Sequence, residues 1–234
     1  MMTVPYTIFP LGDTAITIDF GNSIDVHLNK MVIQLYEIVK AANLFGVKDI
    51  VPAYSSLTIY YDVIAVVKHY HAASPFTVMK RELEALLIEE KQATDMPARQ
   101  LRIPVCYAAK YALDKAEITE LTHFPFEEII SIHISQTYRV YMVGFLPGFA
   151  YMGEVDARIA VPRKKEPRLR IEEGYVGIAG KQTGIYPLTS PGGWQIIGRT
   201  PVKLFDKEKR EPVLFKAGDE VTFFSISEDE FENY

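Results

Sequence analysis

Apolar residues near the start of the chain alternate between strand-like and helix-like spacing. Short β-branched or aromatic runs at 6–8 and 15–20, broken by Gly12-Asp13 and Gly21-Asn22, predict two strands. The next apolar residues recur every three or four positions, which predicts one face of an α-helix that ends near Gly46. The residues of this face are Met31, Val32, Leu35, Ile38, Val39 and Ala42.

The alternation then repeats. Two further strand-like runs occupy 49–53 and 57–61. An amphipathic helix follows, and its apolar face contains Met79, Leu83, Leu86 and Leu87. The predicted order is therefore ββαββα, and two strand pairs with two helices favour a small α+β layer whose helices cover one face of the sheet.

A polar segment separates this region from the rest of the chain. Glu89–Gln100 contains Pro97 and is the predicted linker. We therefore predict two domains, residues 1–94 and residues 100–234.

The second region begins with helical signals and continues as β-structure. Asp114 with Glu117 predicts a capping box ahead of a short helix, and 126–135 predicts another helix. Short β runs separated by Gly/Pro turns then favour a barrel or sandwich. These runs are 140–145, 175–179, 195–197, 202–205 and 221–226. The acidic end, Glu228–Tyr234, is predicted to be a solvated tail.

Composition excludes several functional classes. A hydrophobic content of 48% argues against intrinsic disorder, and a formal charge of −5 argues against a nucleic-acid partner. The single cysteine, Cys106, cannot form an internal disulfide or a multi-cysteine zinc site. We expect no metal or prosthetic group in this chain. The sequence shows neither a signal peptide nor an apolar run of about eighteen residues, so we expect a cytoplasmic protein without a membrane partner.

Glycine and positive charge are concentrated in one segment. Ten of the fourteen glycines lie between Gly144 and Gly198, and residues 138–206 carry ten Lys/Arg against six Asp/Glu. A basic, glycine-rich β segment in an acidic protein predicts a site for a small anion, such as a carboxylate or phosphate. The alternative is an ordinary charged loop at 163–170.

This segment carries a series of motifs that resembles a known family. The motifs are Tyr138-Arg139-Val140-Tyr141, Gly144–Tyr151, Pro162-Arg163, Pro167-Arg168, Gly177–Gly180, Gln182–Pro187, Ser190–Trp194 and Gly198–Pro201. The chain resembles the allophanate hydrolase subunit 1 family, also called the KipI family, and a weaker match extends this resemblance to the N-terminal region.

The resemblance implies both a fold and an activity. It implies a small α+β N-terminal domain followed by a cyclophilin-like β-barrel C-terminal domain. It also implies the role of the B subunit in an ATP-dependent 5-oxoprolinase, acting with a companion C subunit (allophanate hydrolase subunit 2) and an A subunit on 5-oxo-L-proline. ATP is then used by the complex, at a site on this chain or on one of its partners.

Aromatic residues and turns in the motifs supply candidate contacts. Phe145, Pro147 and Phe149 surround a sharp turn, and such aromatics form either an apolar pocket wall or the core. Trp194 follows Gly192-Gly193, where bare backbone lets a ligand or partner approach closely. Trp194 is therefore either a buried anchor or an interface residue, and Tyr186 and Ser190 from the neighbouring motifs complete this set of candidates.

Polar side chains supply the remaining candidates. Arg163, Arg168 and Arg199 each lie next to a proline or one residue from it, so their restrained forks are suited to a carboxylate or phosphate. Gln182 and Thr183 are expected on a constrained turn, with Gln182 and Arg199 converging on one barrel rim that faces a partner. His133 is the one general-base candidate, with a structural histidine as the alternative.

No self-sufficient catalytic set is present. The sequence lacks a phosphate-binding G-x-x-x-x-G-K-[ST] loop, an H-E-x-x-H motif and a G-x-S-x-G elbow. The chain alone is therefore expected to be inactive, with its catalytic residues undetermined. Three alternatives stay open at this point: an inhibitor of a sensor histidine kinase, a component of an allophanate or urea amidolyase-type hydrolase, and a prolyl isomerase inferred from fold alone.

Overall fold

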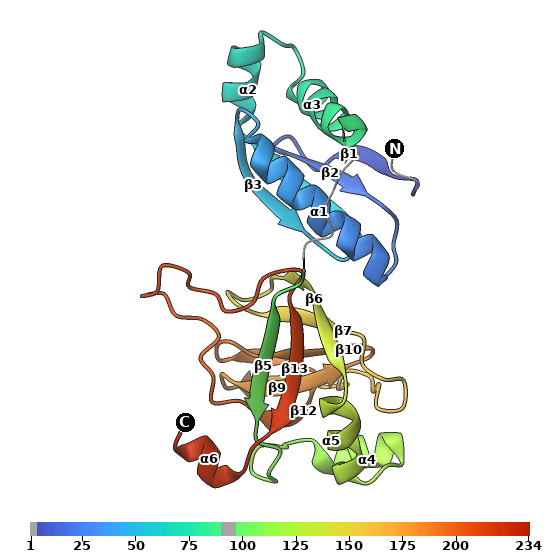
Figure 1. The fold of residues 1–234 in the computed structure, drawn as a ribbon, viewed down its shortest axis with the longest axis vertical. Coiled ribbons are helices and arrows are strands. Elements are labelled where there is room, and N and C mark those ends of the chain that lie inside the picture. The colour runs from blue at the N-terminus through green and yellow to red at the C-terminus, as the bar shows by residue number, and fades with distance from the viewer. Residues whose placement is uncertain (1–3, 90–96) are drawn as a thin grey trace. The chain divides into compact units, whose positions relative to one another are not determined.

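The computed structural model describes residues 4–89 and 97–234 and divides into two compact units, Met1–Pro97 and Ala98–Tyr234 (Figure 1). Most of the predicted linker, residues 90–96, lies outside the described residues. Within the described ranges, no helix has both the length and the apolar character needed to span a bilayer.

The N-terminal unit is one antiparallel sheet covered by helices. Its strand order is β1-β2-β4-β3. The strands are β1 (Thr7–Pro10), β2 (Ala15–Asp19), β3 (Val47–Pro52) and β4 (Ser56–Tyr61). The helices are α1 (Val26–Ala42), α2 (Val63–Tyr70) and α3 (Pro75–Glu89). The two expected strand pairs are thus merged into a single sheet, and α1 and α3 pack on it (Figure 1).

Helix α1 is defined by its caps and its apolar face. The Asp25 carboxylate accepts a hydrogen bond from the Leu28 amide at 2.9 Å, and Asn43 takes the left-handed conformation that ends the helix. Val32 and Leu35 are fully buried on its sheet-facing side. The prediction that Gly46 ends the helix was wrong, because Asn43 tolerates a positive φ three residues earlier.

Helix α2 was missed by the sequence analysis. It follows β4 directly, and its run of Val and Ile residues has the composition of a strand. The side chain of Asp62 decides otherwise, because it caps the helix by accepting a hydrogen bond from the Ala65 amide at 3.0 Å.

The C-terminal unit is built on a curled seven-stranded sheet of order β12-β9-β10-β7-β6-β13-β5, with a two-stranded sheet β11-β8 beside it. Its strands are β5 (Gln100–Val105), β6 (Thr137–Val143), β7 (Ala150–Gly153), β8 (Arg168–Ile171), β9 (Tyr175–Ala179), β10 (Gln182–Ile185), β11 (Ser190–Gly192), β12 (Gln195–Arg199) and β13 (Glu220–Ser225). Only the β13–β5 pair in the large sheet is parallel.

A single bridge brings the two edges of this sheet together. Cys106, just after β5, exchanges backbone hydrogen bonds with Arg199 at the end of β12, at 2.8 and 3.0 Å. Because β5 and β12 are the outermost strands, the bridge joins the ends of the curled sheet into a barrel-like form. The predicted α+β fold with a barrel-like C-terminal unit is confirmed.

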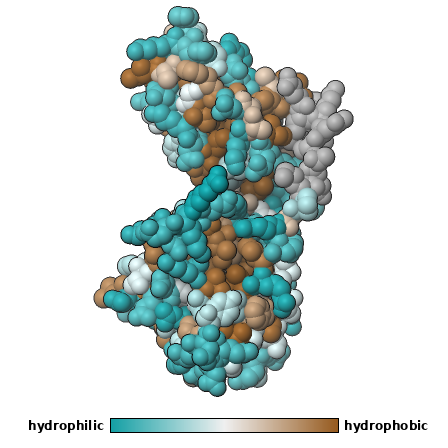
Figure 2. All heavy atoms as spheres, turned by 60° about the vertical axis from the view of Figure 1, so that its left-hand side comes forward, coloured by the Kyte–Doolittle hydropathy of each residue, from teal (hydrophilic) through white to brown (hydrophobic). Residues whose placement is uncertain are grey.

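Helices α4 (Lys115–Thr122) and α5 (Phe126–Ile134) complete the barrel core. Ile118, Ile129 and Ile132 from these helices pack in one cluster with the barrel residues Val140 and Val176. On the face shown in Figure 2, the C-terminal unit also carries an apolar area framed by hydrophilic side chains.

Two further predictions about this unit were wrong. Residues 202–205 form no strand beyond a bridge from Phe205 to Val213. The acidic end is not a solvated tail, because α6 (Glu228–Glu232) begins at a capping box of Ser227 and Glu230, and Phe231 stacks on Tyr111 with ring centroids 4.5 Å apart.

Candidate functional site

His133 is a structural residue inside the barrel. It is fully buried, with Tyr107 Oη 2.9 Å from Nδ1 and Thr183 Oγ1 3.1 Å from Nε2. Thr183 donates its own hydroxyl proton to the Gly177 carbonyl at 3.0 Å, so Nε2–H donates to Thr183 and Nδ1 accepts from Tyr107. Burial lowers the pKa of His133 to about 3, which keeps the ring neutral near neutral pH. This enclosure favours the structural alternative over a general base.

Four of the predicted residues meet in one aromatic cluster. Phe149 makes edge contacts with Phe145, Tyr186 and Trp194 at centroid separations of 5.6, 5.6 and 5.4 Å, and with Tyr151 at 4.9 Å. Phe149, Tyr186 and Trp194 are buried, and burial raises the pKa of the Tyr186 hydroxyl. The cluster therefore serves as a packed base, and Trp194 is a buried anchor within the chain.

Phe145 is the member of this cluster that faces solvent. It is 63% exposed and has a φ of 70°, an uncommon conformation for a bulky residue. It lies in the turn that contains Pro147, where Leu146 donates its amide hydrogen to the Gly144 carbonyl at 2.9 Å. Arg163 lies over the Trp194 ring at 5.9 Å, so one cation and one exposed aromatic ring lie at the edge of the cluster.

Arg168 is occupied by an internal carboxylate. Its guanidinium donates to both oxygens of Asp114, at 2.6 and 2.7 Å, and Lys164 contacts Asp114 at 2.9 Å as well as Glu117. Burial by itself raises the pKa of Asp114, but hydrogen bonds from Arg168, the Ile196 amide and Lys164 outweigh it and lower the pKa. The predicted capping role of Asp114 was wrong, because its side chain binds these partners instead of the first turn of α4.

The side chain of Ser190 is used locally. Ser190 begins β11, where it pairs with Ile171 of β8, and its hydroxyl donates to the Pro191 carbonyl at 3.2 Å. It is buried, so it contributes to the small sheet instead of displaying a polar group to a ligand.

Gln182 and Arg199 do not converge. Both pair with β9, but Gln182 lies opposite Ala179 and Arg199 opposite Tyr175. Four residues of strand separate these positions by roughly 13 Å. Gln182 and Thr183 also belong to β10 and not to a turn, so the prediction of one shared rim was wrong.

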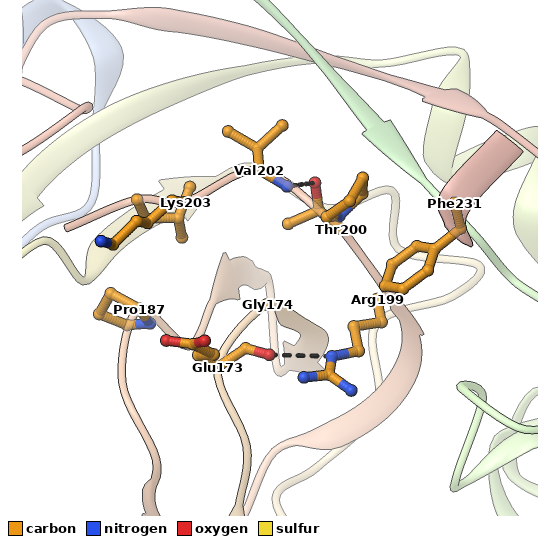
Figure 3. A pocket seen from close by; sticks show the side chains of 10 residues that line it. Glu173, Gly174, Pro187, Arg199, Thr200, Val202, Lys203 and Phe231 are labelled. Carbon is orange, nitrogen blue, oxygen red and sulfur yellow. Dashed lines mark hydrogen bonds between the residues drawn. The ribbon is translucent and has the colours of Figure 1, made fainter. Parts of the chain in front are cut away.

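Arg199 lines a cavity of about 310 Å³ at its own end of β12 (Figure 3). Its Nε donates to the Glu173 carbonyl at 2.9 Å, and Nη1 lies 3.4 Å from the Glu172 carboxylate. The guanidinium also stacks over Tyr175 at 5.0 Å. Backbone pairing with Cys106 and these contacts fix the position of the cation.

Gly174 makes this arrangement possible. It has a φ of +85°, and a Cβ at this position would clash with the Thr200 carbonyl and lie 3.4 Å from Arg199 Cγ. Its amide donates to the Tyr186 carbonyl at 2.7 Å and its carbonyl accepts from Thr200 at 2.9 Å. The turn before β9 is therefore held against the end of β12.

Three residues of this cavity were not found from sequence. Lys203 and Glu173 present opposite charges, and Phe231 supplies an aromatic ring from α6 (Figure 3). The capping pattern Ser227-x-x-Glu230 was available as a signal for α6, but nothing local in the sequence indicates that Phe231 returns to the barrel.

The described residues assemble no metal centre from three or more His, Cys, Asp or Glu side chains. What the site offers is electrostatic and steric: one fixed guanidinium with a lysine and a carboxylate nearby, and a separate aromatic cluster with an exposed ring. Such an arrangement is suited to binding a small polar molecule or another protein.

Comparisons with known proteins agree with this arrangement. The B subunit of 5-oxoprolinase from Bacillus subtilis is 42% identical over all of this chain and 98% of its own. The structure of TTHA0988 superposes with a TM-score of 0.77 and 32% identity over 91% of this chain and 40% of that longer chain. The urea amidolyase of K. lactis shares the fold, with a TM-score of 0.74 and 19% identity over 97% of this chain and 15% of its own.

The family model described as carboxyltransferase domain, subdomain C and D, matches residues 6–215. That range includes the aromatic cluster and Arg199, and it confirms the resemblance read from the motifs. The chain belongs to this carboxyltransferase subdomain C and D family.

Proposed function

We propose that this chain is the B component of an ATP-dependent 5-oxoprolinase complex that hydrolyses 5-oxo-L-proline to L-glutamate in the cytoplasm. The observation that carries the proposal is the match to the corresponding component of the Bacillus subtilis 5-oxoprolinase, which extends over the full length of both chains. A relationship of 42% identity without large gaps in coverage is most simply explained by the same role.

The reaction needs more groups than this chain provides. A lactam carbonyl is a poor electrophile, and phosphorylation of its oxygen by ATP makes the ring carbon easier for water to attack. That step needs donors for the phosphates, a positioned water and a general base. Here His133 is buried and neutral, and Arg168 is paired with Asp114. The chain is accordingly proposed to be inactive alone and to act with companion C and A subunits.

The test is co-expression with the neighbouring C and A subunits, followed by measurement of 5-oxoproline-dependent ATP hydrolysis and glutamate formation. We expect both signals from the complex and neither from this chain alone. Turnover by the purified chain alone would contradict the proposed role in a complex.

The same preparation separates the alternatives. Replacing 5-oxo-L-proline by allophanate tests the urea amidolyase-type reaction. Inhibition of a sensor histidine kinase's autophosphorylation by the chain, without any lactam turnover by the complex, would replace the proposed function with that of a kinase inhibitor.

A further inference from the structure

The Arg199 cavity combines both signs of charge with apolar walls. Arg199 and Lys203 supply positive charge, and Glu173 supplies a carboxylate (Figure 3). The apolar part of the lining comes from Pro187, Val202, Leu204 and Phe231. At about 310 Å³, the cavity lies at the small end of the range for ligand sites.

The positive groups are fixed to different degrees. The Arg199 side chain is only 24% exposed and is held by Glu173, Glu172 and Tyr175, so little side-chain entropy remains to be lost on binding. The Lys203 side chain is 63% exposed and lies 3.4 Å from Asp206, so it is free to turn toward a ligand at small cost.

The acidic neighbours restrict which anion fits. Glu172 and Glu173 lie beside Arg199, so a polyphosphate would meet two negative charges together with its two cations. A ligand with a single carboxylate and a hydrogen-bond donor avoids this repulsion, because its donor faces a glutamate while its carboxylate faces the cations.

We propose that the Arg199 cavity is the binding site of this chain for a small lactam carboxylate, of which 5-oxo-L-proline is an example. The ligand carboxylate pairs with Arg199 and Lys203, its ring N–H donates to the Glu173 carboxylate, and its ring methylenes contact Phe231 and Leu204. This inference rests on the proposed function, and it places the phosphates of ATP outside this cavity.

The test uses the assembled complex and two substrates. We expect Arg199→Ala to raise the KM for 5-oxo-L-proline by roughly tenfold or more, because a charge-assisted hydrogen bond is lost, and to leave the KM for ATP unchanged. The loss should be smaller with 2-pyrrolidinone, which has the lactam but no carboxylate. Lys181→Ala is the matched control, since Lys181 is an exposed cation of the same unit that pairs with Glu154.

A second variant guards against misfolding. Lys203→Ala removes an exposed cation with little structural role and should also raise the KM for 5-oxo-L-proline, with a normal melting temperature and normal co-purification of the complex. An active complex whose KM for 5-oxo-L-proline is unchanged in both variants would overturn the cavity assignment and leave the proposed function standing. A wild-type complex that does not turn over 5-oxo-L-proline would overturn the proposed function, and this inference with it.

Discussion

His133 shows how the surroundings of a residue determine its chemistry. Its position in a motif-rich segment made it a candidate base, but the Tyr107 and Thr183 hydroxyls occupy both ring nitrogens, and burial lowers its pKa to about 3. These neighbours come from distant parts of the chain, 26 and 50 residues away. Local sequence identifies the residue, but only the folded barrel reveals its role.

This burial predicts a pH dependence of stability. Between the ordinary histidine pKa of about 6.5 and the folded value of about 3, the unfolded chain binds a proton that the folded chain does not. The free energy of unfolding should therefore fall as pH drops below about 6.5, by up to ~1.4 kcal/mol per pH unit from this group. Urea unfolding followed by the fluorescence of Trp194, the single tryptophan, measures this effect.

The variant His133→Gln removes the titrating group and should flatten the curve between pH 5 and 6.5, whatever its stability at neutral pH. His123→Asn is the control, because His123 ends α4 in a left-handed conformation that asparagine also adopts. An equally steep decline in His133→Gln would show that His133 does not cause the pH dependence.

At the scale of elements, the parts predicted best are those determined by neighbouring residues. The apolar stripe of α1, the helix at 126–134 and the strand at 175–179 follow from local spacing. The errors arise where distant residues intervene. Asp114 and Arg168 are 54 positions apart, and their pairing converts a predicted cap into a link between α4 and the start of β8.

The Asp114 pairing predicts a large loss of stability on its removal. Asp114→Ala leaves Lys164 and Arg168 without their shared carboxylate, and the side chains of these cations are only 17% and 26% exposed. Breaking a largely buried charge network of this kind should cost about 3 kcal/mol at neutral pH. Denaturant unfolding monitored by Trp194 fluorescence gives the value directly.

The control for this variant is Asp156→Ala. Asp156 pairs with Arg158 at 2.8 Å in the same unit, but Arg158 is 54% exposed, so the loss should be at most about 1 kcal/mol. Equal effects of the two substitutions would mean that the Asp114 network contributes no more than a surface pair.

At the scale of the whole molecule, the change in composition along the sequence indicated two regions. Glycine is concentrated after residue 144 because the barrel needs close approaches such as Gly174 against Thr200, whereas the N-terminal unit packs helices on a sheet. The aromatic cluster follows from the motifs, but the Arg199 cavity does not, because it is assembled from turns and α6, which lie far apart in the sequence.

We predict that residues 1–94 and 100–234 are independently compact. Limited trypsin digestion should cleave first between them, where the sequence offers Lys91 and Arg99, and leave two resistant fragments identifiable by mass spectrometry. Preferential cleavage inside 144–198, with 89–100 resistant, would place the boundary elsewhere.

The most direct test of the central claim is an add-back assay with purified components. The companion A and C subunits by themselves should show no 5-oxoproline-dependent ATP hydrolysis, and this chain alone should show none. Addition of the chain to these companions should restore ATP hydrolysis and glutamate formation, with a plateau when the chain matches its partners in amount. Full activity of the two companions without this chain, or no activity with all three present, would contradict its role in the 5-oxoprolinase complex.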